Sequence, residues 1–191
     1  FVHLSTLQFH ECRMPDSLSF LTPDNSLCQL TRLCVNYCDG LSTSSFASLS
    51  NAPNLQTLEV NSDEFDKGCL LHLQDMIHLR KLDLSGNRIF GDNRSLKTLM
   101  QNLFQLEELN LEQCCYIGNQ GAIARALYST HSRLRVLNLK GCSLEDDDLN
   151  GIGALKNTLE VLHLERNWDL TNGALLHCKD LVKLKKLNLQ L

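Results

Sequence analysis

A nine-residue pattern recurs along this chain at nearly constant spacing. In its clearest copy, LRKLDLSGN from Leu79 to Asn87, leucines occupy the first, fourth and sixth places and asparagine occupies the ninth. Successive copies start 24 to 28 residues apart, so internal repetition decides the fold. The other copies begin at Leu4, Leu30, Leu55, Leu106, Leu134, Leu159 and Leu184, and the last is cut short by the end of the sequence.

Each copy predicts a short strand, and the segment after it predicts a helix. Apolar residues at the fourth and sixth places alternate with polar ones, which is typical of a strand with one buried face. The spacing and period are those of leucine-rich repeats. Strands stack about 4.7–4.9 Å apart while helices need about 8–10 Å, so stacked units must bend. We expect an α/β solenoid of about eight repeats, a curved horseshoe arc with a parallel sheet on the concave face and helices on the convex face. Helical apolar spacing is found at Leu96, Leu99 and Leu103, at Ile123, Ala126 and Leu127, and at Ile152 and Leu155.

The ninth place of each copy holds cysteine, asparagine or aspartate. Because the chain leaves the strand there, we expect this residue to face the core and to hydrogen-bond buried backbone groups. Nine cysteines are an odd number, and four of them fall at this place, which favours a structural role over disulfide bridges. We therefore expect a reducing compartment, the cytoplasm or the nucleus. The ninth-place residues are Cys12, Cys38, Asp63, Asn87, Cys114, Cys142 and Asn167.

Length and composition fit one domain, residues 1–191. The 191 residues are 43% hydrophobic, which suffices for a continuous core. The terminal copies lack the polar caps that repeat arrays need for solubility, so we expect this domain to be part of a longer protein. A formal net charge of −4 argues against nucleic-acid binding, which draws on clustered Lys and Arg. No run of about 18 apolar residues is present, so we expect no membrane span.

Two stretches resemble the cysteine-containing leucine-rich repeats of F-box proteins. They are CDGLST at Cys38–Thr43 and LTNGAL at Leu170–Leu175. A third, NLEQCCYIGNQGAIARAL from Asn110, is similar both to that class and to ribonuclease-inhibitor repeats. The resemblance implies a relation to substrate receptors of cullin-RING ubiquitin ligases, such as the F-box and Zyg-11 groups, or to receptors of the NOD-like type. The sequence itself shows no F-box.

Well-known catalytic sequence motifs are missing from the sequence. It has no Walker loop, no HExxH and no G-x-S-x-G. The stretch Gly151–Gly153 begins like a dinucleotide fingerprint but has no third glycine. We therefore interpret its small residues as allowing close packing of a repeat helix. We expect no enzyme activity and no cofactor.

Two clusters could hold a metal ion, and a structural role is the better interpretation of each. Glu145–Asp148 lacks the alternate-position spacing of a calcium loop, and acids before a helix complement its N-terminus. Cys114 and Cys115, with His131 nearby, lack the spacing of metal ligands. We therefore expect no metal site.

The outward-pointing strand residues should form the binding surface, because they line a rigid sheet and have no role in the core. They occupy the third, fifth and seventh places of each copy and are mostly polar. Aromatic residues are rare on this surface. Binding hot spots are enriched in Trp, Tyr and Arg, so we expect Trp168 and Tyr37 at its rim to be anchor residues. Trp168 could instead cover the end of the core. The predicted partner-binding residues are Tyr37, Glu59, Asp83, Asn110, Glu112, Asn138, Lys140, His163, Glu165, Arg166 and Trp168.

These features predict a non-enzymatic protein-interaction module. The resemblance favours the substrate-recognition arm of a cullin-RING ubiquitin ligase receptor, with a protein partner on the concave face and a cullin adaptor bound through other regions. Two alternatives stay open. One is a regulatory or sensor repeat domain of a NOD-like receptor, and the other is a structural subunit of a large assembly.

Overall fold

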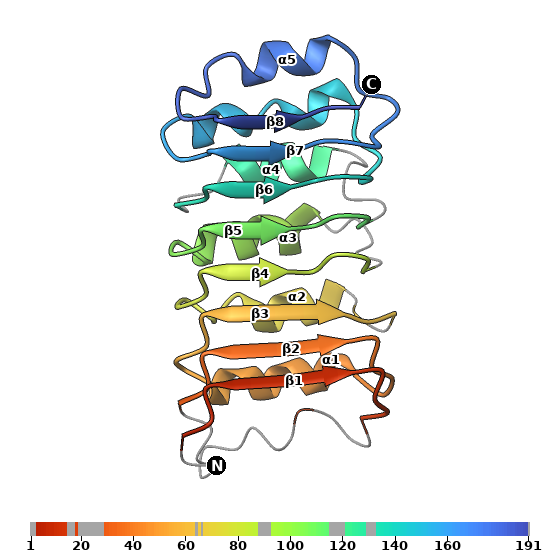
Figure 1. The fold of residues 1–191 in the computed structure, drawn as a ribbon, viewed down its shortest axis with the longest axis vertical. Coiled ribbons are helices and arrows are strands. Elements are labelled where there is room, and N and C mark those ends of the chain that lie inside the picture. Colours follow the sequence, from red (N-terminus) through yellow and green to blue (C-terminus); the bar gives the residue numbers. More distant parts are fainter. Residues whose placement is uncertain are drawn as a thin grey trace.

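The computed structural model of the protein describes residues 3–14, 18, 29–63, 65, 67–87, 93–114, 121–128 and 133–190. Eight short strands form one open parallel sheet, and their order in space follows the sequence (Figure 1). The predicted eight-unit α/β solenoid is thereby confirmed. The strands are β1 (Thr6–His10), β2 (Arg32–Asn36), β3 (Thr57–Asn61), β4 (Lys81–Asp83), β5 (Glu108–Asn110), β6 (Val136–Asn138), β7 (Val161–His163) and β8 (Lys186–Asn188).

Neighbouring strands pair so that equal places of the repeat lie side by side. Leu58 pairs with Leu33 on one side and with Leu82 on the other, and the same match continues to Leu187 on β8. The fourth-place leucines of β2 to β7 are buried in one continuous core. A single unit cannot bury its own leucines, and its neighbours cover them.

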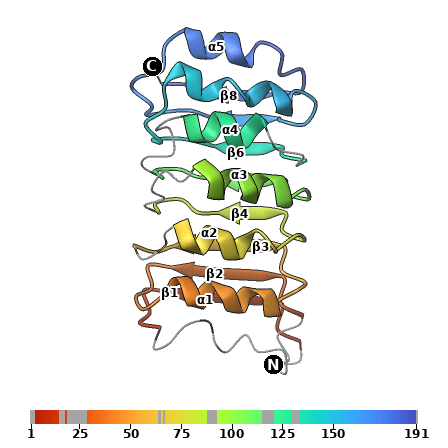
Figure 2. The same cartoon turned by 180° about the vertical axis from the view of Figure 1, so that it is seen from behind.

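The helices of the described residues lie on one side of the sheet, as the view from behind shows (Figure 2). We call the opposite side of the sheet, which the sequence analysis named concave, the open face. In the described residues no helix is both long and apolar enough to cross a membrane. The α-helices are α1 (Thr43–Ala47), α2 (Lys67–Leu73), α3 (Asn93–Asn102), α4 (Ala122–Tyr128) and α5 (Gly173–Cys178), and the 3₁₀-helices are η2 (Ser48–Asn51), η4 (Asp146–Leu149) and η5 (Ile152–Leu155).

The sixth repeat differs from the α-helix expected around Ile152 and Leu155. It has two short 3₁₀-helices, η4 and η5, because the glycines here disfavour a longer α-helix. A β-carbon at Gly151 would overlap the carbonyl of Ala124, so this glycine lets η5 approach α4 closely. The packing interpretation is thus confirmed for Gly151. A β-carbon at Gly153 would meet nothing within 4 Å, and for that residue the interpretation is wrong.

Candidate protein-binding face

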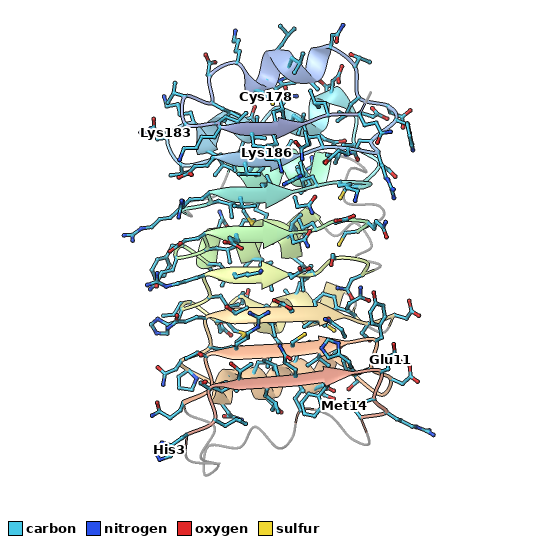
Figure 3. All side chains as sticks on the ribbon, in the orientation of Figure 1. His3, Glu11, Met14, Cys178, Lys183 and Lys186 are labelled. Carbon is cyan, nitrogen blue, oxygen red and sulfur yellow. The ribbon has the colours of Figure 1, made fainter. Side chains whose placement is uncertain are left out.

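The open face has two edges, which we name by the direction of the chain. Strands start at the strand-entry edge, near His3, and end at the strand-exit edge, near Glu11 (Figure 3). Along β3 the third, fifth and seventh places are half-buried while the fourth and sixth are buried. This alternation confirms the strand frame and places the polar residues on the open face.

The fifth-place residues of the middle repeats bind their own backbone. The side-chain oxygens of Asp83, Asn110 and Asn138 accept the N–H of the residue two places on, at 2.9, 3.0 and 3.1 Å. Such local bonds fix each of these side chains against the backbone at the end of its strand. The amide-rich column therefore has a structural role that the sequence analysis did not foresee.

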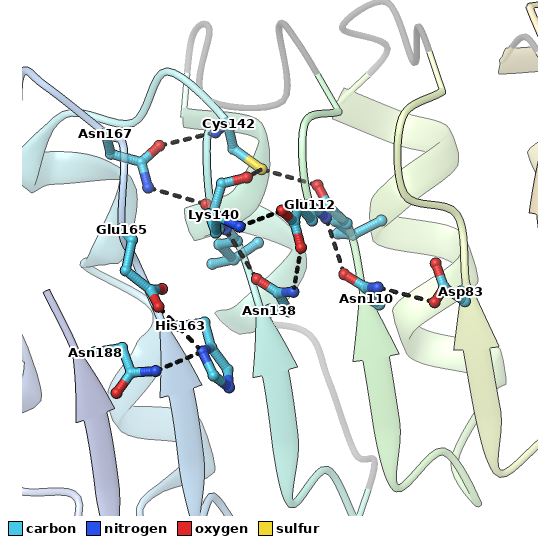
Figure 4. Close-up of polar contacts among 12 residues, drawn as sticks. Asp83, Asn110, Glu112, Asn138, Lys140, Cys142, His163, Glu165, Asn167 and Asn188 are labelled. Atoms are coloured by element: carbon cyan, nitrogen blue, oxygen red, sulfur yellow. Dashed lines mark hydrogen bonds and ion pairs between the residues drawn. The ribbon is translucent and has the colours of Figure 1, made fainter. Parts of the chain in front are cut away.

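The same side chains also bind each other across strands (Figure 4). The Asn110 amide donates to Asp83 at 2.8 Å, and the Asn138 amide donates to Glu112 at 3.2 Å. Lys140 forms an ion pair with Glu112 at 2.5 Å, so these two predicted site residues neutralise each other. The result is a connected polar surface whose side chains are already ordered.

A second group occupies the seventh and eighth repeats. His163 Nδ1 lies 2.9 Å from the Asn188 amide nitrogen and 3.5 Å from Glu165 Oε1. Burial acts to raise the pKa of Glu165, but its own backbone N–H and His163 together hold this pKa below the ordinary value. The other carboxylate oxygen, Oε2, is buried and accepts no hydrogen bond from the residues that the structure describes. This oxygen of Glu165 is therefore shielded from solvent and from a docked partner.

A small pocket of about 160 Å³ lies between these two groups. It brings together four of the predicted site residues, Asp83, Asn110, Asn138 and His163. We call it the open-face pocket. Sequence reasoning missed its third-place members, although the same repeat frame points them to this face. The other lining residues are Lys81, Leu82, Glu108, Leu109 and Val136.

The remaining predicted site residues do not join this pocket. Glu59 is held by Arg32 at 2.7 Å and lies 3.9 Å from Lys81. Tyr37, Arg166 and Trp168 lie at the turns that follow β2 and β7, and Tyr37 and Arg166 have left-handed backbones. Trp168 is 71% exposed, so the interpretation that it covers the core is wrong.

The ninth-place prediction holds for most repeats and fails for the third. Asn87 and Asn167 are fully buried and bond backbone groups of two repeats, and the Cys114 thiol donates to the Leu84 carbonyl at 2.9 Å. Asp63 is exposed instead, and Ser62 points inward in its place. A neutral hydroxyl is less costly to bury than a carboxylate.

The two candidate metal clusters have other roles where the structure describes them. Asp148 accepts the Glu145 backbone N–H at 2.9 Å, which confirms the prediction that these acids cap a helix start, here that of η4. Cys114 is buried at the ninth place as predicted. Cys115 and His131 lie outside the described residues.

Charged side chains alternate along the strand-entry edge. Arg80 pairs with Glu107 at 3.1 Å, and Glu160 is flanked by Arg135 at 3.0 Å and by Lys185 at 2.8 Å. Hydrogen bonds from Arg135 and Lys185 lower the pKa of Glu160 from 4.5 to about 2. Three consecutive repeats are joined at this carboxylate.

We expect the contribution of Glu160 to stability to depend on pH. Its folded pKa lies below its unfolded pKa, so the contribution is complete above about pH 5 and is lost as the pH falls toward 2. The difference in melting temperature between the wild type and Glu160→Gln should shrink over this range, and 1 M salt should reduce it at neutral pH. A difference that is the same at pH 7 and pH 2.5 would contradict this assignment.

Comparisons with known proteins agree with the fold. Residues 75–93 and 104–124 match a family model described as leucine-rich repeat. The structure is similar to an internalin from Listeria monocytogenes, with a TM-score of 0.58, 18% identity, and coverage of 93% of this chain and 54% of that one. It is also similar to a chain of a TLR13–ssRNA13 complex, with a TM-score of 0.58, 20% identity, and coverage of 98% and 25%. A protein from Bacteroides fragilis matches with a TM-score of 0.58, 13% identity, and coverage of 97% and 65%.

The chain spans less than two thirds of the length of each of these three structures. At such low identities the likeness concerns the fold alone. The cysteine-containing subtype is not distinguished by these matches and stays a prediction. Leucine-rich repeats indicate a protein–protein interaction module, because their stacked strands present an extended binding surface. The eight sequence repeats and the eight in-register strands show the leucine-rich repeat fold, and two segments of the chain match the leucine-rich repeat family model.

Proposed function

We propose that this chain is a non-enzymatic interaction module that binds a protein partner through the open face of its fourth to seventh repeats. The open-face pocket carries the proposal, because it gathers polar side chains from four adjacent strands. Bonds between these side chains hold them in place before binding, which lowers the entropy cost of recognition. Ligand pockets usually measure about 300–1,000 Å³. A pocket of about 160 Å³ suits one side chain of a partner better than a cofactor.

The chemistry of this face favours a partner that donates hydrogen bonds. Asp83 and Glu108 bring carboxylates to the pocket. Ionised carboxylates only accept hydrogen bonds, so they suit donors from a bound protein. Val136 adds an apolar contact between these polar groups.

At the level of biological role, we propose the substrate-recognition arm of a cullin-RING ubiquitin ligase receptor in a reducing compartment, the cytoplasm or the nucleus. The resemblance of the cysteine repeats to those of F-box proteins supports this role. The thiols of Cys114 and Cys142 support the compartment, since each donates to a buried carbonyl of the preceding repeat at 2.9 Å. Oxidation of either thiol would remove that bond.

Affinity purification of the full-length protein from its source cells tests both levels. The pocket variant is Asp83→Lys with Asn138→Lys, which fills the open-face pocket with two long cations. The matched control is Asp180→Lys with Asn172→Lys, which changes the net charge equally at exposed positions outside this face. Thermal melting should show that both variants are folded.

We expect the pocket variant to lose its partner by at least about ten-fold, because pocket-filling changes at a central contact are the most damaging. The control should retain the partner, and a cullin adaptor should copurify with every variant. Equal recovery of the partner by both variants would contradict binding through the open face. A full-length protein that brings down no cullin adaptor would contradict the ligase role alone.

A further inference from the structure

A hollow of about 370 Å³ lies at the strand-exit edge, beside the turns that follow β2, β3, β4 and β5. We propose that this exit-edge hollow receives an arginine side chain of a protein partner. It shares no lining residue with the open-face pocket, so this proposal does not depend on the one above. The lining residues are Tyr37, Cys38, Asp39, Asn61, Ser62, Asp63, Gly86 and Gln113.

The hollow arises because the third repeat breaks a rule that other repeats follow. Their eighth residue has a left-handed backbone, as at Tyr37 with a φ of 55° and Gln113 with a φ of 57°. The N–H of each of these two residues donates to a carbonyl of the next repeat at 2.7 Å, which leaves the side chain at the edge. In the third repeat, Ser62 occupies the eighth place and is only 4% exposed. No side chain of that residue stands at the edge.

Hydrogen bonds hold Ser62 in this inward position. Its N–H donates to the side-chain oxygen of Asn87 at 2.9 Å, and its hydroxyl donates to the carbonyl of Cys38 at 3.3 Å. The Asn87 amide is fixed in turn by two backbone carbonyls, those of Val60 at 2.6 Å and Leu84 at 2.7 Å. These buried hydrogen bonds therefore fix Ser62 in its inward position.

The fourth repeat keeps the hollow open because its eighth residue is Gly86. A β-carbon there would lie 2.6 Å from the Asn61 side-chain nitrogen, closer than such atoms approach in proteins. Two adjacent repeats thus have no eighth-place side chain at the edge. Tyr37 closes the gap on one side and Gln113 closes it on the other.

The walls of the hollow carry an aromatic ring and two carboxylates. Tyr37 is 65% exposed, and Asp39 and Asp63 are exposed beside it. Neither carboxylate forms an ion pair with any residue in the described part of the chain, and the lining includes no Lys or Arg. The lining of the hollow therefore offers negative charge and an aromatic ring without including a cationic residue.

Arginine fits this combination better than the other side chains. Its planar guanidinium can stack on the tyrosine ring while its N–H groups donate to carboxylates. Lysine has a compact ammonium that does not stack and is more strongly hydrated. The volume of about 370 Å³ leaves room for the guanidinium group and its stem.

An NMR titration of the isotopically labelled chain tests the assignment without knowledge of the partner. The probe is N-acetyl-arginine amide, and its control is N-acetyl-citrulline amide, which has nearly the same shape but no charge. We expect the arginine probe alone to cause saturable shifts at the backbone amides of Asn61, Ser62 and Gly86. Equal shifts with citrulline, or no saturable shift at these residues, would overturn the proposal.

Variants then separate binding from folding. Tyr37→Gly removes the ring and adopts the left-handed backbone more easily than tyrosine does, so the protein should melt no lower than the wild type. Its affinity for the probe should fall about two- to five-fold, the range of exposed cation–π contacts. Asp39→Asn with Asp63→Asn should abolish the preference for arginine over citrulline. Trp168→Ala, which removes an exposed ring elsewhere, should change nothing, and unaltered binding in Tyr37→Gly would reject the tyrosine contact.

Discussion

Leu137→Ala is expected to lower the free energy of unfolding by about 2–5 kcal/mol, the usual cost of truncating a fully buried leucine. Leu137 is fully buried at the fourth place of β6 and pairs with Leu109 on β5 and Leu162 on β7. The lost side chain would leave a cavity bounded by the two neighbouring repeats, and a regular stack has little freedom to collapse around it. Urea or thermal unfolding of the purified chain measures the change.

A matched control for this prediction is Leu176→Ala. Leu176 is the same residue type, but it lies on α5 and is largely exposed, so its truncation should change stability by less than about 0.5 kcal/mol. A near-neutral effect of Leu137→Ala would show that the repeat does not pack as one core. A large effect of both variants would point to instability of the chain as a whole.

Asn167→Ala is expected to cost about 3–5 kcal/mol, because one buried amide serves four backbone groups. Its nitrogen donates to the carbonyls of Leu139 at 2.9 Å and Leu164 at 2.8 Å. Its oxygen accepts the N–H groups of Cys142 at 2.9 Å and Leu144 at 3.1 Å. Alanine would leave these groups buried without partners at the junction of the sixth and seventh repeats, and equilibrium unfolding should register the loss.

Two variants make this test specific. Asn167→Cys should be less destabilising than Asn167→Ala, because the thiol of Cys142 bonds a carbonyl of the preceding repeat from the same place in the neighbouring unit. Asn172→Ala should be close to neutral, since the Asn172 side chain is exposed and makes no capping bond. A loss below about 1 kcal/mol in Asn167→Ala would mean that water replaces the amide easily.

Residues of the repeat show why so much of the fold could be predicted. Leu58, Leu82 and Leu109 occupy the fourth place of three copies, and each pairs with the same place of the next copy. A short strand with one apolar face has few ways to bury it, and stacking like faces in register is the simplest. The failures lie where local chemistry departs from the repeat. Gly151 lets η5 pack closely on α4 where an α-helix was expected. In the third repeat Ser62 is buried, and the ninth-place residue Asp63 is exposed.

The candidate site could be predicted only in part. The frame correctly placed Asp83, Asn110, Asn138 and His163 on one face, because alternation along a strand is local information. It could not foresee that Lys140 neutralises Glu112, since this ion pair joins residues of two repeats through rotamers that packing selects. Nor could it foresee that the side-chain oxygens of Asp83, Asn110 and Asn138 accept the backbone N–H groups two places on.

The sequence by itself therefore determined the number of repeats, the strand positions and the buried leucines, because these follow from a periodic pattern within each unit. The tertiary structure alone decided which polar side chains pair across strands, which repeat turns its eighth residue inward, and where the open-face pocket and the exit-edge hollow form. Those features depend on contacts between residues about one repeat apart. The repeat pattern does not specify these contacts, because the same pattern is compatible with several side-chain arrangements. Ser62 and Gly86 illustrate the point, since only their position between Tyr37 and Gln113 opens the exit-edge hollow.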